Sequence, residues 1–331
     1  MRILLAIIAM LGAADFTIAW AADSDFNGRW DITVHGNTDC TVTCAWWLEV
    51  TGAGTPQLKG VFVGFPDGSL HELPDLAVRD GVLRFAWDRP AAPGRNGRGP
   101  SAPQHIDYEV RYLNGKLEGS MTGAKNNYTF TGVRAPAISE HDDGTWVKGK
   151  PVTLFNGKDL AGWTGIRSPQ AEGWTVVNGI LTGTGHADDL VTKEKYWNFE
   201  LHAEYRLAEG SNSGIGLRGR YEVQIASDYG KEPGMHGTGA LYTRILPKVN
   251  AGKPAGEWQT YDIRLVGMDV TTVLNGVTLY EKGTIDGLTG IAYDPNEGKP
   301  GSIELQGDHG PVEFRNIVLT PLRRLGGKQT N

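Results

Sequence analysis

Four polar residues in a glycine-rich stretch have side chains suited to binding a sugar and moving a proton. Between Gly210 and Tyr229, the even-numbered positions include Arg218, Arg220, Glu222 and Gln224. The odd-numbered positions include Ile215, Leu217, Tyr221, Val223 and Ile225. Because successive side chains of a strand point to opposite faces, one face would be apolar and the other would carry two guanidiniums, a carboxylate and an amide. A salt-bridged outer strand face produces a similar row, so a sugar-reading surface and an ion-pair row both remain open.

Further candidates lie in the loops. Asp228 directly follows this stretch, and Asp308 and His309 stand between glycines near the last predicted strand. Carboxylates and imidazoles bind divalent cations, so Asp308, His309 and Asp228, together with Glu222, are candidate metal ligands, although their spacing does not define a site. Trp258 is a candidate for stacking on a sugar ring, and core packing at a strand end explains it equally well.

The elements that position these residues are predicted to be strands in two domains. The chain has 331 residues, a length that favours two domains. Its 46 glycines and 10 tryptophans fit strands joined by tight turns better than helices. The net charge of −6 argues against nucleic acid as a partner, because that requires a basic face.

Residues 1–22 have the features of a signal peptide. Arg2 precedes an apolar run that is too short to span a bilayer, and the small-x-small pattern at residues 19–21 is typical of a cleavage site. No later segment is predicted to span a membrane. We therefore expect an exported protein, periplasmic or secreted. In such a protein Cys40 and Cys44 favour a disulfide over free thiols, and a turn must bring them together.

Residues 24–134 are predicted to form a barrel of about eight short strands joined mostly by hairpins. Sequential hairpins are typical of an up-and-down barrel, which also leaves no strand edge exposed. Gly28-Arg29-Trp30 opens the first strand and Arg134 closes the last. This resembles the lipocalin-like arrangement, in which a Gly-x-Trp motif packs against an arginine. A barrel of this size is filled by side chains or holds one small ligand, and the sequence leaves both open.

The polar segment 135–150 is predicted to be a linker, and strands dominate residues 151–322. Without a convincing amphipathic helix, two packed antiparallel sheets are the natural architecture. The basic, glycine-containing residues 323–331 are expected to form a flexible tail.

Several motifs of this second domain follow one another in a recognisable order. They are LFNGKDL at 154–160 with Gly162-Trp163, WTVVNGIL at 174–181, NSGI at 212–215 leading to YEVQI at 221–225, His309-Gly310, and VEFRNI at 312–317. The series resembles the 3-keto-disaccharide hydrolase domain family over residues 151–322. The resemblance implies an all-β, concanavalin-like jelly-roll sandwich and activity on 3-keto-glycosides.

The implied chemistry needs only one base. A ketone at C3 acidifies the hydrogen on C2, and its removal lets the glycosidic oxygen leave from C1 by elimination, after which water adds. Under this scheme Glu222 is the candidate base, Arg218 the cation at the C3 oxygen, and His309 a further catalytic candidate. The row contains one acid, with the amide of Gln224 where a second would stand, and this argues against hydrolysis by two carboxylates.

The remaining site candidates would bind substrate. Gln224 would orient a sugar hydroxyl, and Arg220 would assist it, pair with Glu222 or face solvent. The other candidates for substrate binding are Asp228, Tyr242, Trp258 and Asn212.

Two other functions remain open at this stage. Jelly-roll sandwiches also occur as non-catalytic carbohydrate-binding proteins, and the chain could instead be a partner protein of an exported sugar oxidoreductase. For the enzyme, a sugar 3-dehydrogenase is the expected functional counterpart, because it makes the keto sugar. No nucleotide cofactor is expected, and a divalent cation is left open.

Overall fold

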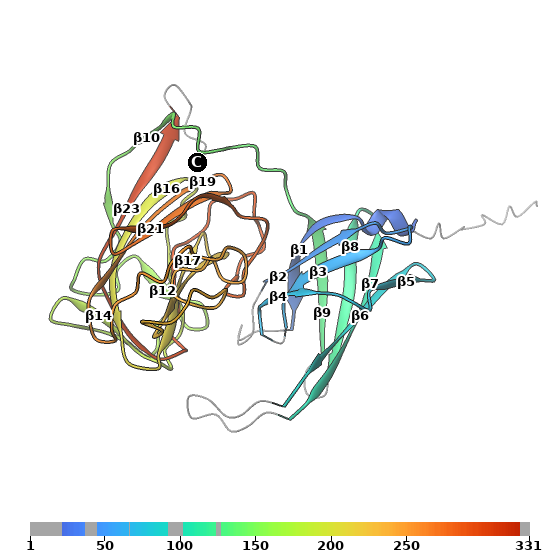
Figure 1. Ribbon diagram of the computed structural model, residues 1–331, viewed down its shortest axis with the longest axis horizontal. Coiled ribbons are helices and arrows are strands. Elements are labelled where there is room, and N and C mark those ends of the chain that lie inside the picture. Colours follow the sequence, from blue (N-terminus) through green and yellow to red (C-terminus); the bar gives the residue numbers. More distant parts are fainter. Residues whose placement is uncertain (1–21, 37–44, 66, 92–101, 124–126, 325–331) are drawn as a thin grey trace, which may run out of the picture.

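The computed structural model describes residues 22–36, 45–65, 67–91, 102–123 and 127–324. Within these ranges the chain forms strands and one short 3-10 helix, η1 (Asp23–Phe26), so the predicted all-β class is confirmed. Figure 1 shows two lobes, an N-terminal curled sheet and a C-terminal sandwich. Across the same ranges, the chain contains no helix with the length and apolar character of a membrane span. The predicted signal peptide and the Cys40–Cys44 disulfide lie outside the described residues and stay predictions.

The N-terminal lobe is one curled sheet of nine strands. Its strands are β1 (Gly28–His35), β2 (Ala45–Thr51), β3 (Lys59–Val63), β4 (Leu70–Glu72), β5 (Ala77–Arg79), β6 (Val82–Arg89), β7 (Gln104–Leu113), β8 (Lys116–Gly123) and β9 (Asn127–Arg134). They lie in the order β4-β3-β2-β1-β9-β8-β7-β6-β5, so consecutive strands pair and β9 returns to β1. Among the described residues no pairing joins β4 to β5, and the curled sheet keeps these two edges. Its lipocalin-like character stays a prediction.

Aromatic side chains fill the interior of the curled sheet. Trp46 is fully buried, and its ring centroid lies 5.8 Å from that of Phe62, 6.0 Å from that of Tyr108 and 5.4 Å from that of Phe130. Phe85 stacks on Tyr108 with centroids 4.5 Å apart. Of the two interiors left open by the sequence, the structure has the one packed with side chains.

The contact expected between the Gly-x-Trp motif and Arg134 is present. The Arg134 guanidinium lies 4.3 Å from the Trp30 ring centroid and donates to the backbone carbonyls of Asn27 at 2.5 Å and Asp25 at 3.0 Å. Gly28 has φ +125°, and a Cβ there would stand 2.4 Å from Arg134 Nη1. The motif therefore fastens the start of β1 to the end of β9.

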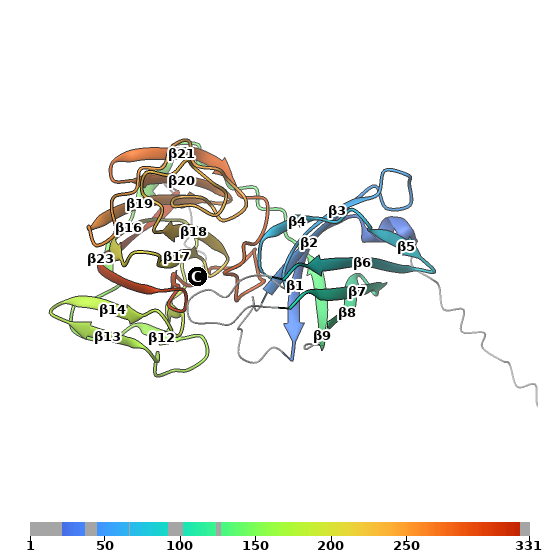
Figure 2. The ribbon, with the colours of Figure 1, turned by 60° about the horizontal axis from the view of Figure 1, so that its bottom comes forward.

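The C-terminal lobe is a jelly-roll sandwich of two sheets (Figure 2). The larger sheet contains β13 (Trp174–Val177), β14 (Ile180–Thr184), β23 (Pro311–Arg324), β16 (Phe199–Leu207), β19 (Gln259–Val266), β20 (Asp269–Leu274) and β21 (Val277–Thr284), with β10 (Trp146–Lys148) and β11 (Val152–Thr153) paired to β23. The smaller sheet has the order β12 (Trp163–Gly165), β15 (Leu190–Thr192), β22 (Glu304–Leu305), β17 (Asn212–Leu217) and β18 (Tyr221–Ala226).

Alternating apolar residues form the core between these two sheets. Tyr205 of β16 stacks on Tyr261 of β19 with ring centroids 5.2 Å apart. From the smaller sheet, Ile215, Val223 and Leu305 join the same buried cluster. The other parity of the smaller sheet must therefore face away from the core.

The segment between the lobes is packed along the sandwich. Asp142 forms an ion pair with Arg264 at 2.7 Å, and β10 pairs with the end of β23 in the register Trp146↔Arg324. The expectation that the flexible tail starts at Arg323 is therefore wrong for its first two residues, because β10 supplies strand partners for both.

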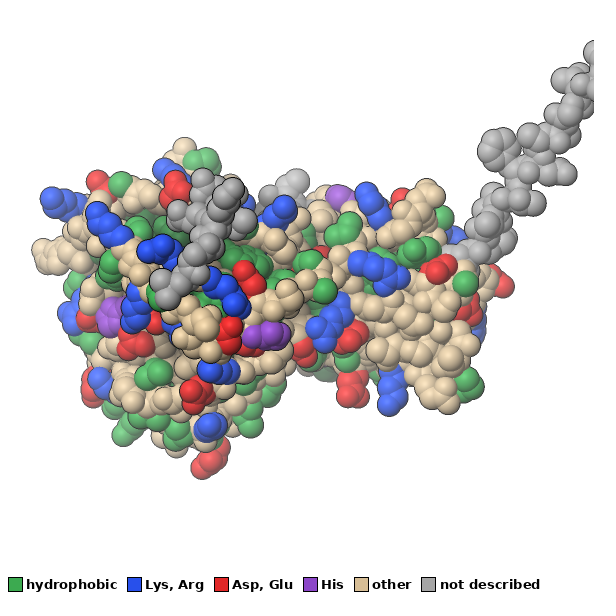
Figure 3. Space-filling view, turned by 90° about the horizontal axis from the view of Figure 1, so that it is seen from above, with side chains coloured by type: hydrophobic (Ala, Val, Ile, Leu, Met, Phe, Trp, Pro, Cys, Tyr) green, Lys and Arg blue, Asp and Glu red, His purple; other side chains and the backbone are tan. Residues whose placement is uncertain are grey.

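The two lobes share buried contacts. The outward side chain of Trp47 on β2 belongs to the core cluster of the sandwich, and the Arg244 guanidinium lies 4.4 Å from its ring centroid. The backbones also approach closely, because a Cβ on Gly290 would stand 2.7 Å from the carbonyl oxygen of Gly68. On the face in Figure 3 acidic and basic side chains are interspersed over both lobes.

A pair of acidic residues meets inside this interface. Asp31 of β1 is 2% exposed, and the backbone N–H of Glu297 donates to its carboxylate at 3.4 Å. The Tyr221 hydroxyl donates to Glu297 at 2.9 Å. Burial, followed by the nearby Glu297 carboxylate, raises the pKa of Asp31 to about 9. Asp31 therefore enters the folded protein in its neutral form.

Removing this titration is expected to flatten the dependence of stability on pH. Because the pKa of Asp31 is higher in the folded than in the unfolded chain, the folded state binds the extra proton, and the associated stability is lost as pH rises towards about 9. The melting temperature of the wild-type protein should fall between pH 6 and pH 9. The Asp31→Asn variant should lose less and melt a few degrees higher than wild type at pH 9. Parallel melting curves for the two proteins over this range would contradict the assignment.

Candidate active site

The stretch that carries the four predicted polar residues is a hairpin. β17 ends at Leu217, β18 begins at Tyr221, and Arg218 occupies the turn with φ +57°. The expected row of four residues on one strand face is therefore wrong. The period-2 pattern holds within β18, where Tyr221, Val223 and Ile225 face the core.

Arg218 is buried away from the position predicted for it. Its Nε donates to the carbonyl of Trp197 at 2.7 Å and its Nη2 to Asn198 Oδ1 at 3.1 Å, while the guanidinium lies 3.7 Å from the Trp197 ring centroid. Burial lowers the pKa of Arg218 to about 10. These contacts hold the turn against the segment before β16, and they do not bring the guanidinium beside Glu222.

Arg220 is also committed to structural contacts. Its Nη2 donates to Asp294 Oδ2 at 2.6 Å and its Nη1 to the carbonyl of Lys299 at 2.8 Å. It is fully buried, so neither the expected pairing with Glu222 nor a place in solvent is observed. Arg220 thus binds two points of the loop between β21 and β22 and holds it in place.

The outward face of the smaller sheet presents a different row, which crosses all five strands. The paired positions run Thr164, Val191, Glu304, Gly216 and Glu222. Glu222 and Glu304 thus stand on the two strands that flank β17, on the same face and level with the glycine between them. The second carboxyl that the sequence seemed to lack comes from β22.

Two glycines make room for this pair. A Cβ on Gly214 would lie 2.4 Å from Glu222 Oε1, and a Cβ on Gly216 would lie 2.7 Å from Glu304 Oε2. Each carboxyl group therefore rests over one glycine of β17. Because these glycines are two residues apart on one strand, the two carboxyl groups are separated by roughly 7 Å.

Unsatisfied acceptors mark the floor of the site. Glu304 is fully buried, and neither of its carboxyl oxygens has a hydrogen-bond partner among the described residues. Oε1 of Gln306, two positions further along the same face, is equally unpaired. Buried acceptors without partners are costly, and sugar hydroxyl groups are the kind of donor that would satisfy them.

Burial sets the protonation of the two glutamates. It raises the pKa of Glu222 to about 8, and the carboxylates of Asp189 and Asp308 add to this, whereas His309 opposes it. Burial also raises the pKa of Glu304 well above its ordinary value, with Asp189 and Glu222 contributing. Burial thus favours the neutral form of both glutamates, and the pKa of Glu222 lies close to the neutral range.

More charged residues border the pair on the side of β15. The backbone N–H of Gly307 donates to Asp189 at 2.7 Å, and burial, then Asp308, raises the pKa of Asp189 to about 7. Asp308 is also hydrogen-bonded to His309. Burial alone would lower the pKa of His309, but this hydrogen bond and the charge of Asp308 raise it. His309 is 48% exposed and can meet a ligand.

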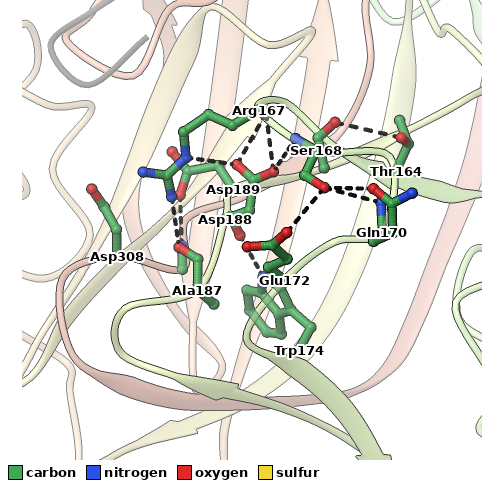
Figure 4. Close-up of polar contacts among 12 residues, drawn as sticks. Thr164, Arg167, Ser168, Gln170, Glu172, Trp174, Ala187, Asp188, Asp189 and Asp308 are labelled. Atoms are coloured by element: carbon green, nitrogen blue, oxygen red, sulfur yellow. Dashed lines mark hydrogen bonds and ion pairs between the residues drawn. The ribbon is translucent and has the colours of Figure 1, made fainter. Parts of the chain in front are cut away.

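Arg167 brings a cation to the same border (Figure 4). Its Nε donates to Asp188 Oδ1 at 3.0 Å and its Nη2 to the carbonyl of Ala187 at 3.0 Å. The charges of Asp188, Asp189 and Asp308 raise the pKa of Arg167 against the effect of burial. The site thus combines acids with one fixed guanidinium.

Gln224 and Asp228 support the neighbouring loop. Gln224 donates to the carbonyl of His236 at 3.2 Å and accepts from the backbone N–H of Ile225 at 3.1 Å. Asp228 accepts from the backbone and the hydroxyl of Thr238, at 2.9 and 2.6 Å. Both side chains therefore hold the neighbouring loop in place. These hydrogen bonds engage the groups that were predicted to contact substrate.

The candidate metal ligands are not assembled. Asp308 and His309 lie together, but Asp228 is occupied at the far end of β18. Within the described ranges no group of three or more His, Cys, Asp and Glu side chains is arranged to hold a metal ion.

The remaining predicted residues divide into two groups. Tyr242 and Asn212 belong to the site, since the Tyr242 N–H donates to the carbonyl of Glu222 at 2.9 Å and the Asn212 N–H to that of His309 at 3.1 Å. Trp258 does not. It lies between Arg206 and Arg315 on the outer face of the larger sheet, with their guanidiniums 4.8 and 3.9 Å from its ring centroid.

Sequence reasoning missed Glu304, Asp189 and Arg167. Glu304 occupies a two-residue strand, which is too short to show a period. The Asp188-Asp189 doublet was visible, but only the fold shows that Asp188 pairs with Arg167 while Asp189 borders the glutamates.

Adding one methyl group at either glycine is expected to disable the site. In Gly214→Ala and Gly216→Ala, the new Cβ would displace a buried carboxyl group, and we expect activity to fall by about 100-fold or more, since displacements of about 1 Å can cost this much. Gly132→Ala, in a strand of the N-terminal lobe where the new Cβ would stand 3.1 Å from Leu117 Cβ, is the control for a tightly placed methyl group away from the site. Full activity on a 3-keto-glycoside in both site variants, with melting temperatures near wild type, would show that the carboxyl positions do not matter.

The chain was compared with known proteins and families. Residues 150–320, more than half of the chain, match the model of the 3-keto-alpha-glucoside-1,2-lyase-like domain. A 3-keto-disaccharide hydrolase of Bacteroides thetaiotaomicron is 35% identical over 74 residues, which are 19% of this chain and 26% of that protein. The chain thus spans about a quarter of the length of this curated relative.

Solved structures similar to this chain include two candidate glycosyl hydrolases from Parabacteroides distasonis. One is 30% identical with a TM-score of 0.45, covering 54% of this chain and 91% of its own. The other is 24% identical with a TM-score of 0.44, covering 51% of this chain and 92% of its own. The match to the family model confirms the resemblance predicted from the motifs, and the chain belongs to the 3-keto-alpha-glucoside-1,2-lyase-like domain family.

Proposed function

We propose that this protein cleaves the glycosidic bond of 3-keto-glycosides by removing the proton on C2 and expelling the group on C1. The observation that carries the proposal is the pair of buried glutamates on either side of β17, where burial raises the pKa of Glu222 to about 8 and that of Glu304 well above its ordinary value. Removal of a proton next to a ketone needs a base and a hydrogen-bond donor for the developing enolate oxygen. A carboxylic acid kept neutral by its surroundings can serve as that donor.

Glu222, Glu304 and His309 each have one role in the proposed reaction. Ionised Glu222 takes the hydrogen on C2, and the electron pair of the C–H bond moves towards the C3 oxygen, which accepts a hydrogen bond from protonated Glu304. The C1–O bond then breaks, and protonated His309, held by Asp308, gives its proton to the leaving oxygen. Water adds across the C1–C2 double bond, with its hydroxyl on C1 and a proton on C2. The balance is substrate plus water giving a keto sugar and an alcohol.

The name of the Bacteroides relative, a 3-keto-disaccharide hydrolase, supports a keto sugar as substrate. Because a sugar becomes a 3-ketone only by oxidation, we also propose a sugar 3-dehydrogenase as the functional counterpart. The segment at residues 1–22 supports export to the periplasm or beyond.

A second candidate function is ordinary hydrolysis by two carboxyl groups. The separation of roughly 7 Å between the carboxyl groups of Glu222 and Glu304 falls in the range of inverting glycosidases. The two functions differ in substrate, since ordinary hydrolysis needs no ketone.

The deciding experiment compares aglycone release from a 3-keto-glucoside and from its unoxidised parent, each with and without chelator. Release from the keto substrate alone supports elimination, and release from the parent supports ordinary hydrolysis. Saturable sugar binding without release from either substrate would instead indicate a binding protein. Loss of release on chelation would reveal a required cation.

Neutralising Glu222 is expected to abolish turnover while leaving the fold intact. For the wild-type protein, kcat/KM should rise with pH towards about 8, because the base works only after losing its proton, and should fall again where His309 loses the proton that it donates. Glu222→Gln should lower kcat at least about 100-fold. Glu281→Gln, an exposed site on β21, is the matched control. Residual turnover in Glu222→Gln with the same rising pH profile would assign the base to another residue.

A further inference from the structure

We infer that the N-terminal lobe completes the active site, with Ser69 as a positioning residue that aims the Tyr242 hydroxyl at the substrate. This inference rests on the proposed function and assigns a role to a lobe that lies outside the matched family domain.

Ser69 lies where the N-terminal lobe reaches the catalytic sheet. It stands just before β4 and is 8% exposed, and its backbone N–H donates to Asp67 Oδ1 at 3.0 Å. Its hydroxyl oxygen is 3.2 Å from His236 Nε2. Ser69 also lies close enough to the Tyr242 side chain to lower the pKa of that phenol, against the larger effect of burial. One buried serine thus borders two aromatic side chains of the other lobe.

Tyr242 connects this contact to the proposed base. Its backbone N–H donates to the carbonyl of Glu222 at 2.9 Å, and its side chain is near enough for the Glu222 charge to contribute to its raised pKa. The His236 ring meets the Tyr242 ring edge-on, with centroids 5.0 Å apart. Tyr242 therefore stands between Ser69 and the glutamate.

The inferred role requires one polarity of these contacts. The Ser69 hydroxyl has a single hydrogen, and in the inferred arrangement it donates this hydrogen to the Tyr242 oxygen. The serine oxygen is then left to accept from His236, with the ring hydrogen on Nε2. In this arrangement the hydrogen of Tyr242 is directed to another acceptor, and a substrate oxygen beside Glu222 is suitably placed.

Other contacts keep Ser69 in position. The backbone N–H of Leu70 donates to Thr243 Oγ1 at 3.1 Å, and Thr243 has a left-handed φ of +56°. Next to it, Arg244 lies over Trp47 and donates to the carbonyl of Leu288 at 2.7 Å. Because a β-branched residue rarely adopts this φ unless its surroundings fix it, these contacts hold the Tyr242 loop against the N-terminal lobe.

The test is steady-state kinetics of the full chain on a 3-keto-glucoside. Ser69→Ala should lower kcat roughly 10- to 100-fold with little change in KM, since the hydroxyl of Tyr242 would lose its orientation. Ser69→Thr keeps a hydroxyl and should recover most of the rate. Tyr242→Phe should cost about as much as Ser69→Ala, and the double variant should cost no more than either, because both act through one group.

Ser120→Ala, in β8 of the same lobe, controls for a general effect of removing a hydroxyl. Unchanged kcat in Ser69→Ala, or additive losses in the double variant, would overturn the positioning role. If Ser69→Ala fails to fold, Tyr242→Phe decides, and full activity there overturns the inference. Wild-type release from the keto substrate is measured alongside, so a failure of the proposed function is recognised separately.

Discussion

Burial of unpaired carboxyl groups is the constraint on which the site depends. An ionised acid without partners is too costly to enclose, so such a group stays neutral until its surroundings or a ligand compensate it. Glu304 meets this condition fully and Glu222 partly. Two glycines of β17 meet the same constraint, because only residues without a Cβ leave space for the two carboxyl groups that lie over this strand. The proposed site would therefore depend on the missing side chains of Gly214 and Gly216 as much as on the two carboxyl groups.

Sequence reasoning identified the strand β18 and separated its two faces but misjudged the turn before it. Period 2 correctly separated Tyr221, Val223 and Ile225 from Glu222 and Gln224, since both faces of this strand are constrained by packing. The predicted row extended to Arg218 because the alternation of polar and apolar residues continues through the tight turn. The pattern therefore does not reveal where the strand begins. Glu304 could not be found this way, as two residues carry no period and its neighbours in the sheet lie some 90 positions earlier in the chain.

The division into lobes was predictable, and their cooperation was not. Turn signals and the opening motif of the N-terminal lobe describe contacts within it, such as Arg134 against Trp30. The interface instead uses isolated residues, among them Trp47 and Ser69, whose neighbours are fixed only by docking. The alternation of Trp46 and Trp47 shows the difficulty, because one ring fills the curled sheet while the other joins the core of the sandwich. A pair of adjacent tryptophans does not reveal which partner each will have.

Two buried acids titrate with opposite consequences, and together they bound the working pH. Under the proposed mechanism, loss of the proton from Glu222 near pH 8 creates the base, so activity would gain as pH rises towards this value. Loss of the proton from Asp31 near pH 9 places a charge between the lobes beside Glu297, so the docked state is weakened by the same conditions. Because Tyr221, which binds Glu297, directly precedes Glu222 on β18, the interface and the base share one strand. Under the proposed mechanism, the pH range that favours the base therefore adjoins the range in which the buried contact between the lobes loses stability.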